Sequence, residues 1–237
     1  MKAKIRNIVV QSLEDLSPHM RRIVFAGPDL ADFPDRQESA HVKVIVPEQN
    51  ASKRGFWPAL AKKSRMRSYT IRFFDHAART LTMDFAVNDH RGLVADWALT
   101  TKVGDSVQIA GPGSIKHTDF DAEWHLLLAD LTALPALAAT LERLPNSARG
   151  HIVVQVPTIA DKQDLAVPDN MTIQWIINAD TSQNLLLKAL PDLEWLPGEP
   201  AMFVATESSH VVEIRKYLRE QPGFRKDKLY ASGYWTA

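Results

Sequence analysis

The segment Arg67-Ser68-Tyr69-Thr70-Ile71-Arg72 combines three side-chain chemistries within a few residues of one predicted strand. A guanidinium can hold a phosphate through two parallel hydrogen bonds, an aromatic ring can stack on a planar group, and a hydroxyl can donate a hydrogen bond. A flavin dinucleotide needs all three, although the same residues would also fit a solvated strand with incidental Arg and Tyr. Strand alternation predicts Arg67, Tyr69 and Ile71 on one face. Thr70 would then reach a flavin ring only at its edge or through backbone groups.

A predicted helix over residues 93–100 follows Gly92, and its first backbone N–H groups could bind a pyrophosphate. The candidate groups are the N–H groups of Leu93, Val94 and Ala95. Such a contact uses the backbone, so it does not depend on which side chains stand there. The alternative is an ordinary amphipathic helix with Trp97 in the core.

A second helix start lies within Leu128-Ala129-Asp130-Leu131-Thr132-Ala133-Leu134-Pro135-Ala136, where a predicted strand runs into a helix. A nucleotide could dock on this helix start beside Thr132, but a capped helix with Pro135 in its first turn fits the same residues. No GxGxxG fingerprint is present, so the spacing predicts no dinucleotide-binding Rossmann fold. Near the end of the sequence, Trp235 in Gly233-Tyr234-Trp235 could lie against a flavin or pack the last strand.

Basic residues gather before Arg67, in a connection that also contains Phe56 and Trp57. Cations with aromatic neighbours attract a bulky anionic ligand, whereas the alternative is a charged surface loop. Because 28 Lys and Arg balance 28 Asp and Glu, a site for an anion must gather its cations locally. The candidate substrate-binding residues are Lys53, Arg54, Lys62, Lys63 and Arg65.

The composition excludes several classes of protein. The absence of cysteine rules out disulfides, thiol nucleophiles and protein-held iron–sulfur clusters, so redox chemistry would need a bound cofactor. Histidine spacing fits no metal site and no GxSxG motif occurs, so we expect neither a protein-held metal nor a hydrolase. The neutral charge argues against nucleic acid, and the apolar runs are too short to span a membrane. The charged N-terminal segment is no signal peptide, so we expect a cytoplasmic protein.

Two patterns of predicted elements follow each other along the chain. Up to about residue 111, short strand candidates are separated by turn residues, which predicts an antiparallel barrel. Six strands are expected, with a helix at Leu93–Thr100 between the fifth and the sixth. The strands are Ile5–Gln11, Arg22–Ala26, His41–Val46, Arg67–Phe74, Leu81–Val87 and Ser106–Ala110.

After Gly111-Pro112-Gly113, apolar strands alternate with helices, which predicts an open parallel sheet. The expected strands are Trp124–Ala129, Ile152–Val156, Ile173–Ile177, Ala201–Ala205 and Leu229–Ser232; the expected helices are Ala133–Leu144, Asn184–Leu190 and Ser209–Glu220. We place the domain boundary near residues 112–121. The predicted fold class is therefore two-domain, with an N-terminal six-stranded antiparallel β-barrel (residues 1–115) and a C-terminal α/β open parallel-sheet domain (residues 116–237).

The ordered set of motifs resembles the siderophore-interacting protein family, the flavin-dependent ferric-siderophore reductases of the ferredoxin-reductase-like superfamily. The Arg-x-Tyr-Thr-x-Arg pattern of that family is met by Arg67, Tyr69, Thr70 and Arg72. Four further landmarks follow in the family's order and at similar spacing, so the resemblance covers most of the chain. They are Asp84-Phe85-Ala86-Val87 with Gly92, Trp97-Ala98 and Gly104-Asp105; Gly111-Pro112-Gly113-Ser114; Leu128 to Ala136; and Gly233-Tyr234-Trp235.

The chain departs from the family pattern at several of these landmarks. Asn88-Asp89 stands where the family has His-Gly, and Gly92-Leu93-Val94-Ala95 stands where it has Gly-Pro-Ala-Ser. In the segment around Asp130, Ala129 and Leu131 replace the usual Gly and Glu. With Leu131 in place of the usual Glu, the chain lacks an acidic residue in the segment where the family would recognise a pyridine nucleotide.

The resemblance implies a cytoplasmic flavoenzyme that reduces the Fe(III) of a ferric siderophore to Fe(II), using non-covalent FAD and electrons from NAD(P)H or reduced ferredoxin. No side-chain acid or base is implied, because the flavin does the chemistry. The implied FAD contacts are Arg67, Ser68, Tyr69, Thr70, Arg72, Gly92, Leu93, Val94, Ala95, Thr132 and Trp235. The rival hypothesis is a siderophore- or flavin-binding carrier that keeps the fold without turnover. We expect a monomer whose partners are an anionic ferric siderophore and, as a donor, ferredoxin, with neither nucleic acid nor a membrane.

Overall fold

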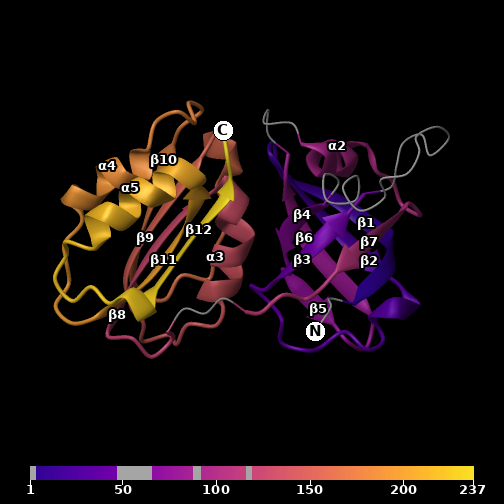
Figure 1. Cartoon of the computed structure of the whole chain (residues 1–237), viewed down its shortest axis with the longest axis horizontal. Coiled ribbons are helices and arrows are strands. Elements are labelled where there is room, and N and C mark those ends of the chain that lie inside the picture. The colour runs from indigo at the N-terminus through magenta and orange to yellow at the C-terminus, as the bar shows by residue number, and fades with distance from the viewer. Residues whose placement is uncertain (1–3, 47–65, 88–91, 116–118) are drawn as a thin grey trace, which may run out of the picture. The chain divides into compact units, whose positions relative to one another are not determined.

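The computed structural model describes residues 4–46, 66–87, 92–115 and 119–237. The contacts between residues divide the chain into two compact units, Met1–Ile115 and Lys116–Ala237 (Figure 1). The first unit is built on an antiparallel sheet and the second on a parallel sheet. The predicted fold class is therefore confirmed, with a difference in the number of N-terminal strands.

The N-terminal unit contains a seven-stranded sheet in the order β4-β3-β7-β1-β2-β6-β5. Its strands are β1 (Ile5–Ser17), β2 (Met20–Ala26), β3 (His41–Ile45), β4 (Met66–Thr70), β5 (Phe73–Asp75), β6 (Thr80–Ala86) and β7 (Ser106–Ala110). A 3-10 turn, η1 (Pro28–Leu30), follows β2, and the helix α2 (Leu93–Thr100) lies between β6 and β7. The predicted bounds of α2 and β7 agree with these.

The seventh strand arises because the predicted strand Arg67–Phe74 is broken in two. The backbone N–H of Ile71 donates to the carbonyl of Ala40, beside β3, at 2.8 Å. The N–H of the next residue, Arg72, donates to the carbonyl of Thr82 on β6, at 2.9 Å. The chain thus changes its pairing partner between these two residues, and a continuous six-strand count was wrong.

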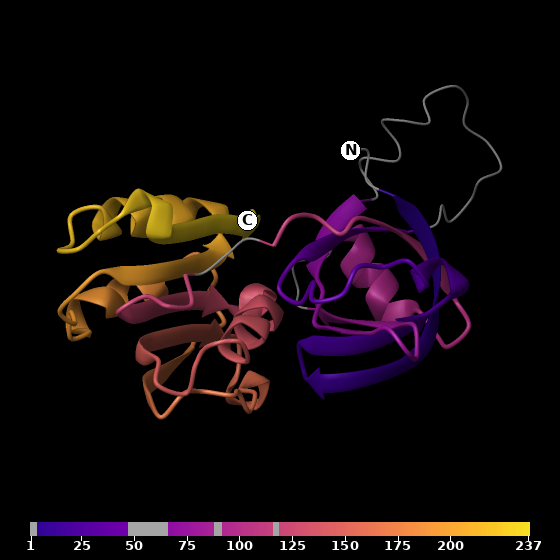
Figure 2. The ribbon, with the colours of Figure 1, turned by 90° about the horizontal axis from the view of Figure 1, so that it is seen from below.

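The strands of this unit alternate between buried and exposed residues, as expected for a sheet with one buried face. In β1, Ile8 and Val10 are buried while their neighbours are exposed, and in β2 the buried residues include Ile23 and Phe25. Helix α2 covers one end of the strands (Figures 1 and 2). It adds Val94, Trp97 and Ala98 to the same apolar core.

The C-terminal unit is a five-stranded parallel sheet in the order β10-β9-β8-β11-β12. Its strands are β8 (Trp124–Asp130), β9 (Arg149–Val156), β10 (Asn170–Ile177), β11 (Pro200–Glu207) and β12 (Leu229–Trp235). The helical segments are η2 (Leu131–Ala133), α3 (Leu134–Leu141), η3 (Ile159–Asp161), α4 (Leu185–Ala189), η4 (Leu190–Asp192), α5 (Ser208–Leu218) and η5 (Lys226–Lys228). Figure 2 shows β12, in yellow, at one edge of the sheet.

Helices cover both faces of this parallel sheet, which explains its uninterrupted apolar strands. Every residue of β8 and of β11 is buried. Helices α4 and α5 lie on one face and α3 on the other (Figure 1). On the α4 and α5 face, Leu126 and Leu128 of β8 belong to the same core cluster as Leu186 and Ile214.

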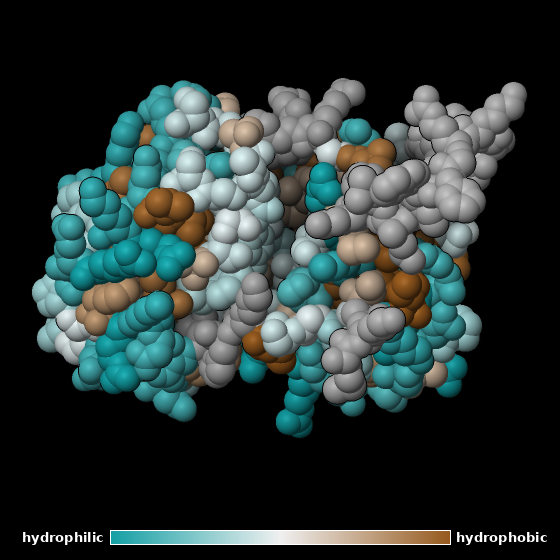
Figure 3. All heavy atoms as spheres, viewed as in Figure 1, coloured by the Kyte–Doolittle hydropathy of each residue, from teal (hydrophilic) through white to brown (hydrophobic). Residues whose placement is uncertain are grey.

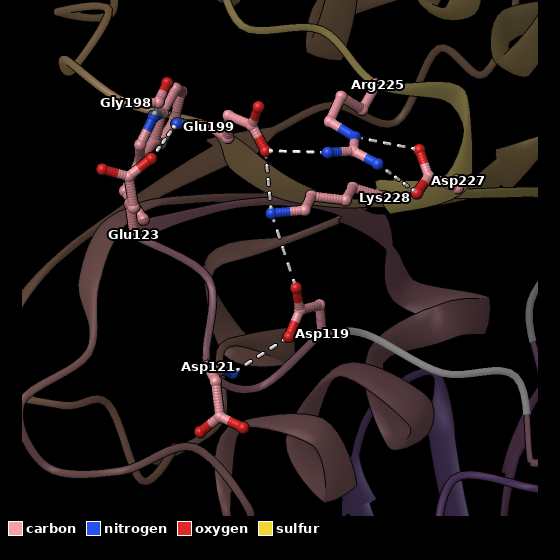
Figure 4. A network of polar contacts seen from close by, with 9 residues as sticks. Asp119, Asp121, Glu123, Gly198, Glu199, Arg225, Asp227 and Lys228 are labelled. Atoms are coloured by element: carbon pink, nitrogen blue, oxygen red, sulfur yellow. Dashed lines mark hydrogen bonds and ion pairs between the residues drawn. The ribbon is translucent and has the colours of Figure 1, made fainter.

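Ion pairs connect the segments that precede the strands at the amino-terminal end of this sheet (Figure 4). Lys228, at the end of η5, lies 3.0 Å from Glu199 and 3.7 Å from Asp119. Arg225 bridges Glu199 and Asp227, at 3.4 and 2.9 Å. Asp119 precedes β8, Glu199 precedes β11 and Lys228 precedes β12. The network therefore connects the amino-terminal ends of three strands.

The exposed large apolar residues come from different elements, for example Phe73 on β5, Ile159 in η3 and Val212 on α5. On the face seen in Figure 3, brown apolar atoms occur in separate groups among teal polar ones. Such scattered exposure is normal for a globular domain. No helix in the four described ranges has both the length and the apolar character needed to cross a membrane.

Candidate functional site

The strand β4 carries the Arg-x-Tyr-Thr motif and lies at the edge of the N-terminal sheet, paired with β3. Arg67 pairs with Val44 and Tyr69 pairs with Val42, and both valines are fully buried. Arg67 is nevertheless exposed, whereas Tyr69 is half-buried. Arg67 and Tyr69 therefore share a face, as strand alternation predicts.

Aromatic contacts join Tyr69 to the helix α2. The ring centroids of Tyr69 and Phe85 on β6 are 4.3 Å apart, and those of Phe85 and Trp97 on α2 are 6.3 Å apart. Burial raises the pKa of the Tyr69 phenol, and the charge of Arg67 opposes that rise only in part. The hydroxyl of Tyr69 therefore stays protonated at neutral pH and can donate a hydrogen bond. The ring of the same side chain can stack on a planar group.

Among the described residues, no side chain caps the start of α2. Its N-cap is Gly92, which has no side chain to donate or accept a hydrogen bond. A Cβ built on Gly92 would meet no described atom within 4 Å. The N–H groups at an uncapped helix start attract anions, both through hydrogen bonds and through the helix dipole. The first turn of α2, from Leu93 to Ala95, can therefore receive a phosphate group.

Other predicted contacts in the motif are directed elsewhere. Ser68 is exposed and pairs with Lys43, on the opposite face of β4 from Tyr69. Thr70 is 7% exposed, next to the point where the chain turns from β3 toward β6. Arg72 is also 7% exposed, and its guanidinium lies over the ring of Phe73 at 4.0 Å. The structure thus places Arg67 and Tyr69 on one face of β4 and Ser68 on the other.

Asp84, the first residue of the second family landmark, is part of a structural ion pair. Its carboxylate accepts two parallel hydrogen bonds from Arg22 on β2, at 2.7 and 2.8 Å. Asp84 is 4% exposed, so the paired guanidinium offsets the cost of burying its charge. The ion pair therefore links the neighbouring strands β2 and β6.

The candidate substrate-binding residues fall in one gap of the description. Lys53, Arg54, Lys62, Lys63 and Arg65 all lie outside the described residues. Their role stays a prediction from the sequence.

The second predicted nucleotide site, at the start of η2 and α3, is capped by the chain itself. Asp130 Oδ1 accepts hydrogen bonds from Thr132 N at 2.9 Å, Thr132 Oγ1 at 2.6 Å and Ala133 N at 3.3 Å. The capped-helix alternative therefore describes the local geometry, with Pro135 in the first turn of α3. The hydrogen-bonding groups of Thr132 at this helix start are directed at Asp130.

The second oxygen of Asp130 reaches two residues far away in the sequence. Oδ2 accepts hydrogen bonds from Thr206 Oγ1 on β11 and from the indole Nε1 of Trp235 on β12, both at 2.8 Å. Trp235 is half-buried at the carboxyl end of its strand. Its carbonyl accepts a hydrogen bond from Ser208 Oγ at 2.7 Å.

Sequence reasoning did not single out Asp130 or Thr206 as site residues. The spacing of Asp130 and Thr132 is a helix-cap signal that the sequence does contain. The contact between Asp130 and Trp235 joins residues 105 positions apart, which no local pattern could reveal.

The residues of the N-terminal unit fit a flavin dinucleotide. Arg67 supplies an exposed guanidinium for a phosphate, Tyr69 a ring for stacking, and α2 an uncapped helix start for the pyrophosphate. These groups are linked within one unit, because β6 contacts both β4 and α2. The Gly92 N-cap supports the fit, because a glycine has no side chain that could compete with an anion for the first N–H groups of α2.

Known proteins show the same organisation. The family described as "Siderophore-interacting FAD-binding domain" matches residues 9–116, and the one described as "Siderophore-interacting protein" matches residues 122–237. Ferric vibriobactin reductase ViuB of Vibrio cholerae serotype O1 is 32% identical over an alignment of 232 positions that covers 93% of this chain and 85% of that protein. The NADPH-dependent ferric-chelate reductase of Escherichia coli K12 is 26% identical over 245 residues, covering 99% of this chain and 94% of that protein.

Solved structures agree with these matches. The siderophore-interacting protein SipS from Aeromonas hydrophila superposes with a TM-score of 0.86 at 32% identity, over 99% of this chain and 92% of SipS. Ferredoxin-NADP+ reductase from Plasmodium falciparum, at 12% identity, superposes with a TM-score of 0.65 over 98% of this chain and 97% of that one. This second likeness concerns the fold alone and identifies it as ferredoxin-reductase-like. From both domain matches and from these relatives, the chain belongs to the siderophore-interacting protein family.

Proposed function

We propose that this chain is an FAD-dependent ferric-siderophore reductase. The observation that carries the proposal is that β6 contacts both β4, which bears Arg67 and Tyr69, and α2, whose first N–H groups can receive a phosphate. The names of the relatives ViuB and the Escherichia coli reductase support the same reaction class, since both are ferric reductases.

In this proposal the N-terminal unit, residues 1–115, is the FAD-binding domain. Arg67 binds one phosphate through its exposed guanidinium, and the first turn of α2 binds the pyrophosphate through backbone N–H groups. Tyr69 stacks on the isoalloxazine while its other face rests on Phe85, so the ring enters the complex already oriented. Thr70 contributes a buried hydroxyl or backbone contact at the edge of the ring. Gly92 lets the pyrophosphate approach this helix start; Ser68, Arg72 and Trp235 remain contacts expected from the sequence alone.

FAD supplies the redox chemistry when bound, by accepting a hydride equivalent and releasing electrons singly to iron. Each NAD(P)H donates two electrons and leaves as NAD(P)+ with one proton released, and two Fe(III) ions become two Fe(II) ions. The protein residues bind, orient and screen the cofactor. Iron then leaves the siderophore, because an oxygen-rich chelator holds the smaller and more highly charged ferric ion far more tightly.

The substrate is an anionic ferric siderophore. ViuB is named as a reductase of ferric vibriobactin, and we infer a siderophore of similar charge for this chain. The basic stretch Lys53, Arg54, Lys62, Lys63 and Arg65 is proposed to attract it, because a neutral protein needs a local cluster of cations for an anionic ligand.

The C-terminal unit, residues 116–237, is proposed to receive the electron donor, as an α/β domain of the NAD(P)H-binding type. The Escherichia coli relative is named as an NADPH-dependent reductase, which favours a pyridine nucleotide. Reduced ferredoxin is the second candidate donor. We further propose that the protein acts in the cytoplasm as a monomer.

Anaerobic flavin spectroscopy tests the proposal. The purified protein, supplemented with FAD and gel-filtered, should be yellow with one FAD per chain. It should bleach with NADPH, NADH or reduced ferredoxin, and regain its colour when a ferric tricatecholate siderophore is added, with Fe(II) trapped by a ferrous chelator. A protein that takes up no FAD would remove the reductase proposal. One that binds FAD or siderophore but transfers no electrons would instead be the carrier.

A further inference from the structure

The order of the strands in the parallel sheet indicates where a nucleotide would bind. From β8 the chain first moves outward to β9 and β10, and it then returns to β11 and β12 on the other side of β8. In open α/β sheets with this order, dinucleotides bind outside the carboxyl ends of the strands, and the ribose 2′ position of the adenosine is recognised after the second strand. The second strand here is β9, next to the edge strand β10. The segments after these two strands, 157–164 and 178–184, would therefore contact the adenosine.

Each of four strands is followed by a carboxylate that accepts hydrogen bonds from the backbone of the next turn. The four are Asp130 at the end of β8, Asp161 after β9, Asp180 after β10 and Glu207 at the end of β11. In many nucleotide-binding sheets, backbone N–H groups at these positions receive a phosphate. In this chain the N–H groups are bonded to carboxylates of the chain itself. At these four turns, a phosphate would meet acidic groups in place of unbonded N–H groups.

The two segments that would contact the adenosine are acidic. Three carboxylates stand against a single cation and no arginine is present; the charged residues are Asp161, Lys162, Asp164 and Asp180. Hydrogen bonds from Ser182 and Gln183 lower the pKa of Asp180, so this exposed carboxylate is ionised at neutral pH. A 2′-phosphate adds about two negative charges at neutral pH, and an arginine is the residue that accommodates it in NADP-binding sheets. The charges of these segments therefore disfavour the phosphate that distinguishes NADPH from NADH.

Two aliphatic side chains are exposed at the same ends of the two strands. Ile159, in η3 after β9, is 72% exposed, and Ile177, the last residue of β10, is 46% exposed. The strand ends lie side by side, since Ile177 pairs with Val156 and the N–H of Asn178 donates to the carbonyl of Val156 at 2.8 Å. Apolar side chains line most small-molecule sites, where a few polar groups add specificity. This end of the sheet therefore provides apolar contacts for a purine beside acidic groups that repel a phosphate.

We propose that the carboxyl ends of β9 and β10 bind the adenosine of a dinucleotide without a 2′-phosphate, so that NADH rather than NADPH is the pyridine-nucleotide donor of this chain. Ile159 and Ile177 contact the adenine, and the acidic segments exclude the 2′-phosphate. The proposal rests on the proposed function, in which the C-terminal unit receives the donor, and every residue that it uses belongs to that unit. The chain then differs from the Escherichia coli relative, which is named as NADPH-dependent.

Binding of nucleotide fragments tests the site without any redox step. ADP-ribose and 2′-phospho-ADP-ribose are the parts of NADH and NADPH without the nicotinamide, and they differ only in the 2′-phosphate. Both are titrated calorimetrically into the whole chain, with and without added FAD. We expect ADP-ribose to bind at least about tenfold more tightly, because the phosphate meets like charges and gains no guanidinium, and higher salt should narrow the difference. Equal or tighter binding of the phosphorylated ligand, or no binding of ADP-ribose, would overturn the proposal.

One added cation at the end of β9 should reduce the preference. Ile159→Arg changes a side chain that is already mostly exposed, so the variant should fold like wild type. The new guanidinium can bond to the 2′-phosphate and still stack on a purine. Affinity for 2′-phospho-ADP-ribose should therefore rise by roughly tenfold, with little change for ADP-ribose. Val212→Arg, at a site 67% exposed on α5, is the matched control and should change neither. An unchanged ratio in Ile159→Arg, or the same change in the control, would contradict the proposed site.

The adenine contact is tested by a variant that alters no charge. Ile177→Ser removes apolar surface, so it should weaken ADP-ribose and 2′-phospho-ADP-ribose by the same factor, roughly three- to tenfold, because both ligands carry the adenine. Val212→Ser, the control on α5, should weaken neither. Affinities within about twofold of wild type in Ile177→Ser would show that the adenine binds elsewhere, against the proposal.

Flavin reduction connects the site to the reaction. Under anaerobic conditions, kcat/KM for NADH should exceed that for NADPH by about tenfold or more, and Ile159→Arg should narrow this ratio through KM rather than kcat. A chain that binds FAD and is reduced by ferredoxin, but binds no ADP-ribose, would overturn this inference and leave the proposed function in place. A chain that prefers ADP-ribose but takes up no FAD would remove the reductase proposal, and with it the role of NADH as the donor.

Discussion

The ring of Tyr69 rests on the ring of Phe85, with centroids 4.3 Å apart and planes inclined by 37°. Tyr69 comes from the edge strand β4 and Phe85 from β6, so this contact joins two strands that are not neighbours in the sheet. An aromatic residue supported in this way can present a second surface to a flavin without a large entropic cost, because the side chain is already ordered.

The supported ring gives the first prediction. Tyr69→Ala should weaken FAD binding and perturb the flavin spectrum, because it removes the stacking surface. Tyr69→Phe should retain most of the binding, because the stacking face survives. Equilibrium FAD titration monitored by flavin fluorescence measures both. Equal losses in the two variants would exclude stacking as the role of Tyr69. Tyr230→Ala, which removes a comparable contact with Phe203 in the other unit, should leave the flavin spectrum unchanged.

Arg67 gives the second prediction. Arg67→Ala should raise the Kd for FAD by roughly tenfold to a hundredfold, because a lost hydrogen bond between charged groups costs about 1.5–3 kcal/mol. Arg67→Lys should recover only part of the affinity, since an ammonium cannot hold a phosphate through two parallel bonds. Flavin stoichiometry after gel filtration at low protein concentration checks this. The exposed Arg219, on the C-terminal side of α5, is the control, and Arg219→Ala should behave as wild type.

A substitution at the start of α2 should separate stability from cofactor binding. Leu93 is 46% exposed in the first turn, where an acidic side chain is favourable to the helix dipole. Leu93→Asp should therefore maintain or raise the Tm of the apoprotein while it weakens FAD binding, because the new charge repels the pyrophosphate. Leu93→Asn, similar in size but neutral, should bind FAD nearly as well as wild type. If the two variants bind FAD equally, the pyrophosphate lies away from this helix start.

The basic stretch before β4 can be tested as a group. Replacing Lys53, Lys62, Lys63 and Arg65 together by Gln should raise the KM for an anionic ferric siderophore and flatten its salt dependence, with FAD content intact. No single cation should be decisive, because exposed charge pairs contribute little individually. A control variant with the same change in charge replaces Lys102, Lys162, Lys188 and Lys216 by Gln. Identical kinetics in the two variants would show that the siderophore binds elsewhere.

His125 should make the C-terminal unit sensitive to acid. It is 1% exposed on β8, neither ring nitrogen has a hydrogen-bond partner among the described residues, and burial lowers its pKa against a smaller opposing effect of Asp119. The unfolded chain binds this proton near pH 6.5, so stability is complete above that pH and falls as the pH drops toward the lower folded pKa. His125→Leu should flatten the decline in Tm between about pH 7 and 5. Parallel curves for the two proteins would contradict the prediction.

The sequence predicted the fold where its patterns were strong. The apolar run Trp124–Ala129 marks a strand that is buried on both faces. The alternation of apolar and polar residues in Ser106–Ala110 marks a strand that is buried on one face. The break between β4 and β5 was missed, since it depends on backbone bonds from Ile71 and Arg72 to different strands. Local patterns do not contain that choice of partner.

The candidate site divides in the same way. Arg67 and Tyr69 were predicted to share a strand face and do so, because the period of a strand is a local property. The support of Tyr69 by Phe85 and the bond from Trp235 to Asp130 depend on how distant strands are brought together. Thr132 illustrates the limit most clearly: the sequence was compatible with a nucleotide site or a cap, and the hydrogen bonds of the structure correspond to the cap.

The five hydrogen bonds that converge on Asp130 also constrain how the sequence can diverge. Replacing the aspartate alone would leave the donors of Thr132, Thr206 and Trp235 without an acceptor, and each buried unsatisfied donor is costly. Loss of Trp235 alone would leave a lone pair of the carboxylate unused. Changes at these positions should therefore occur together during evolution. Among related sequences, we expect residues 130, 206 and 235 to covary, although they come from three different strands and span more than a hundred positions of the chain.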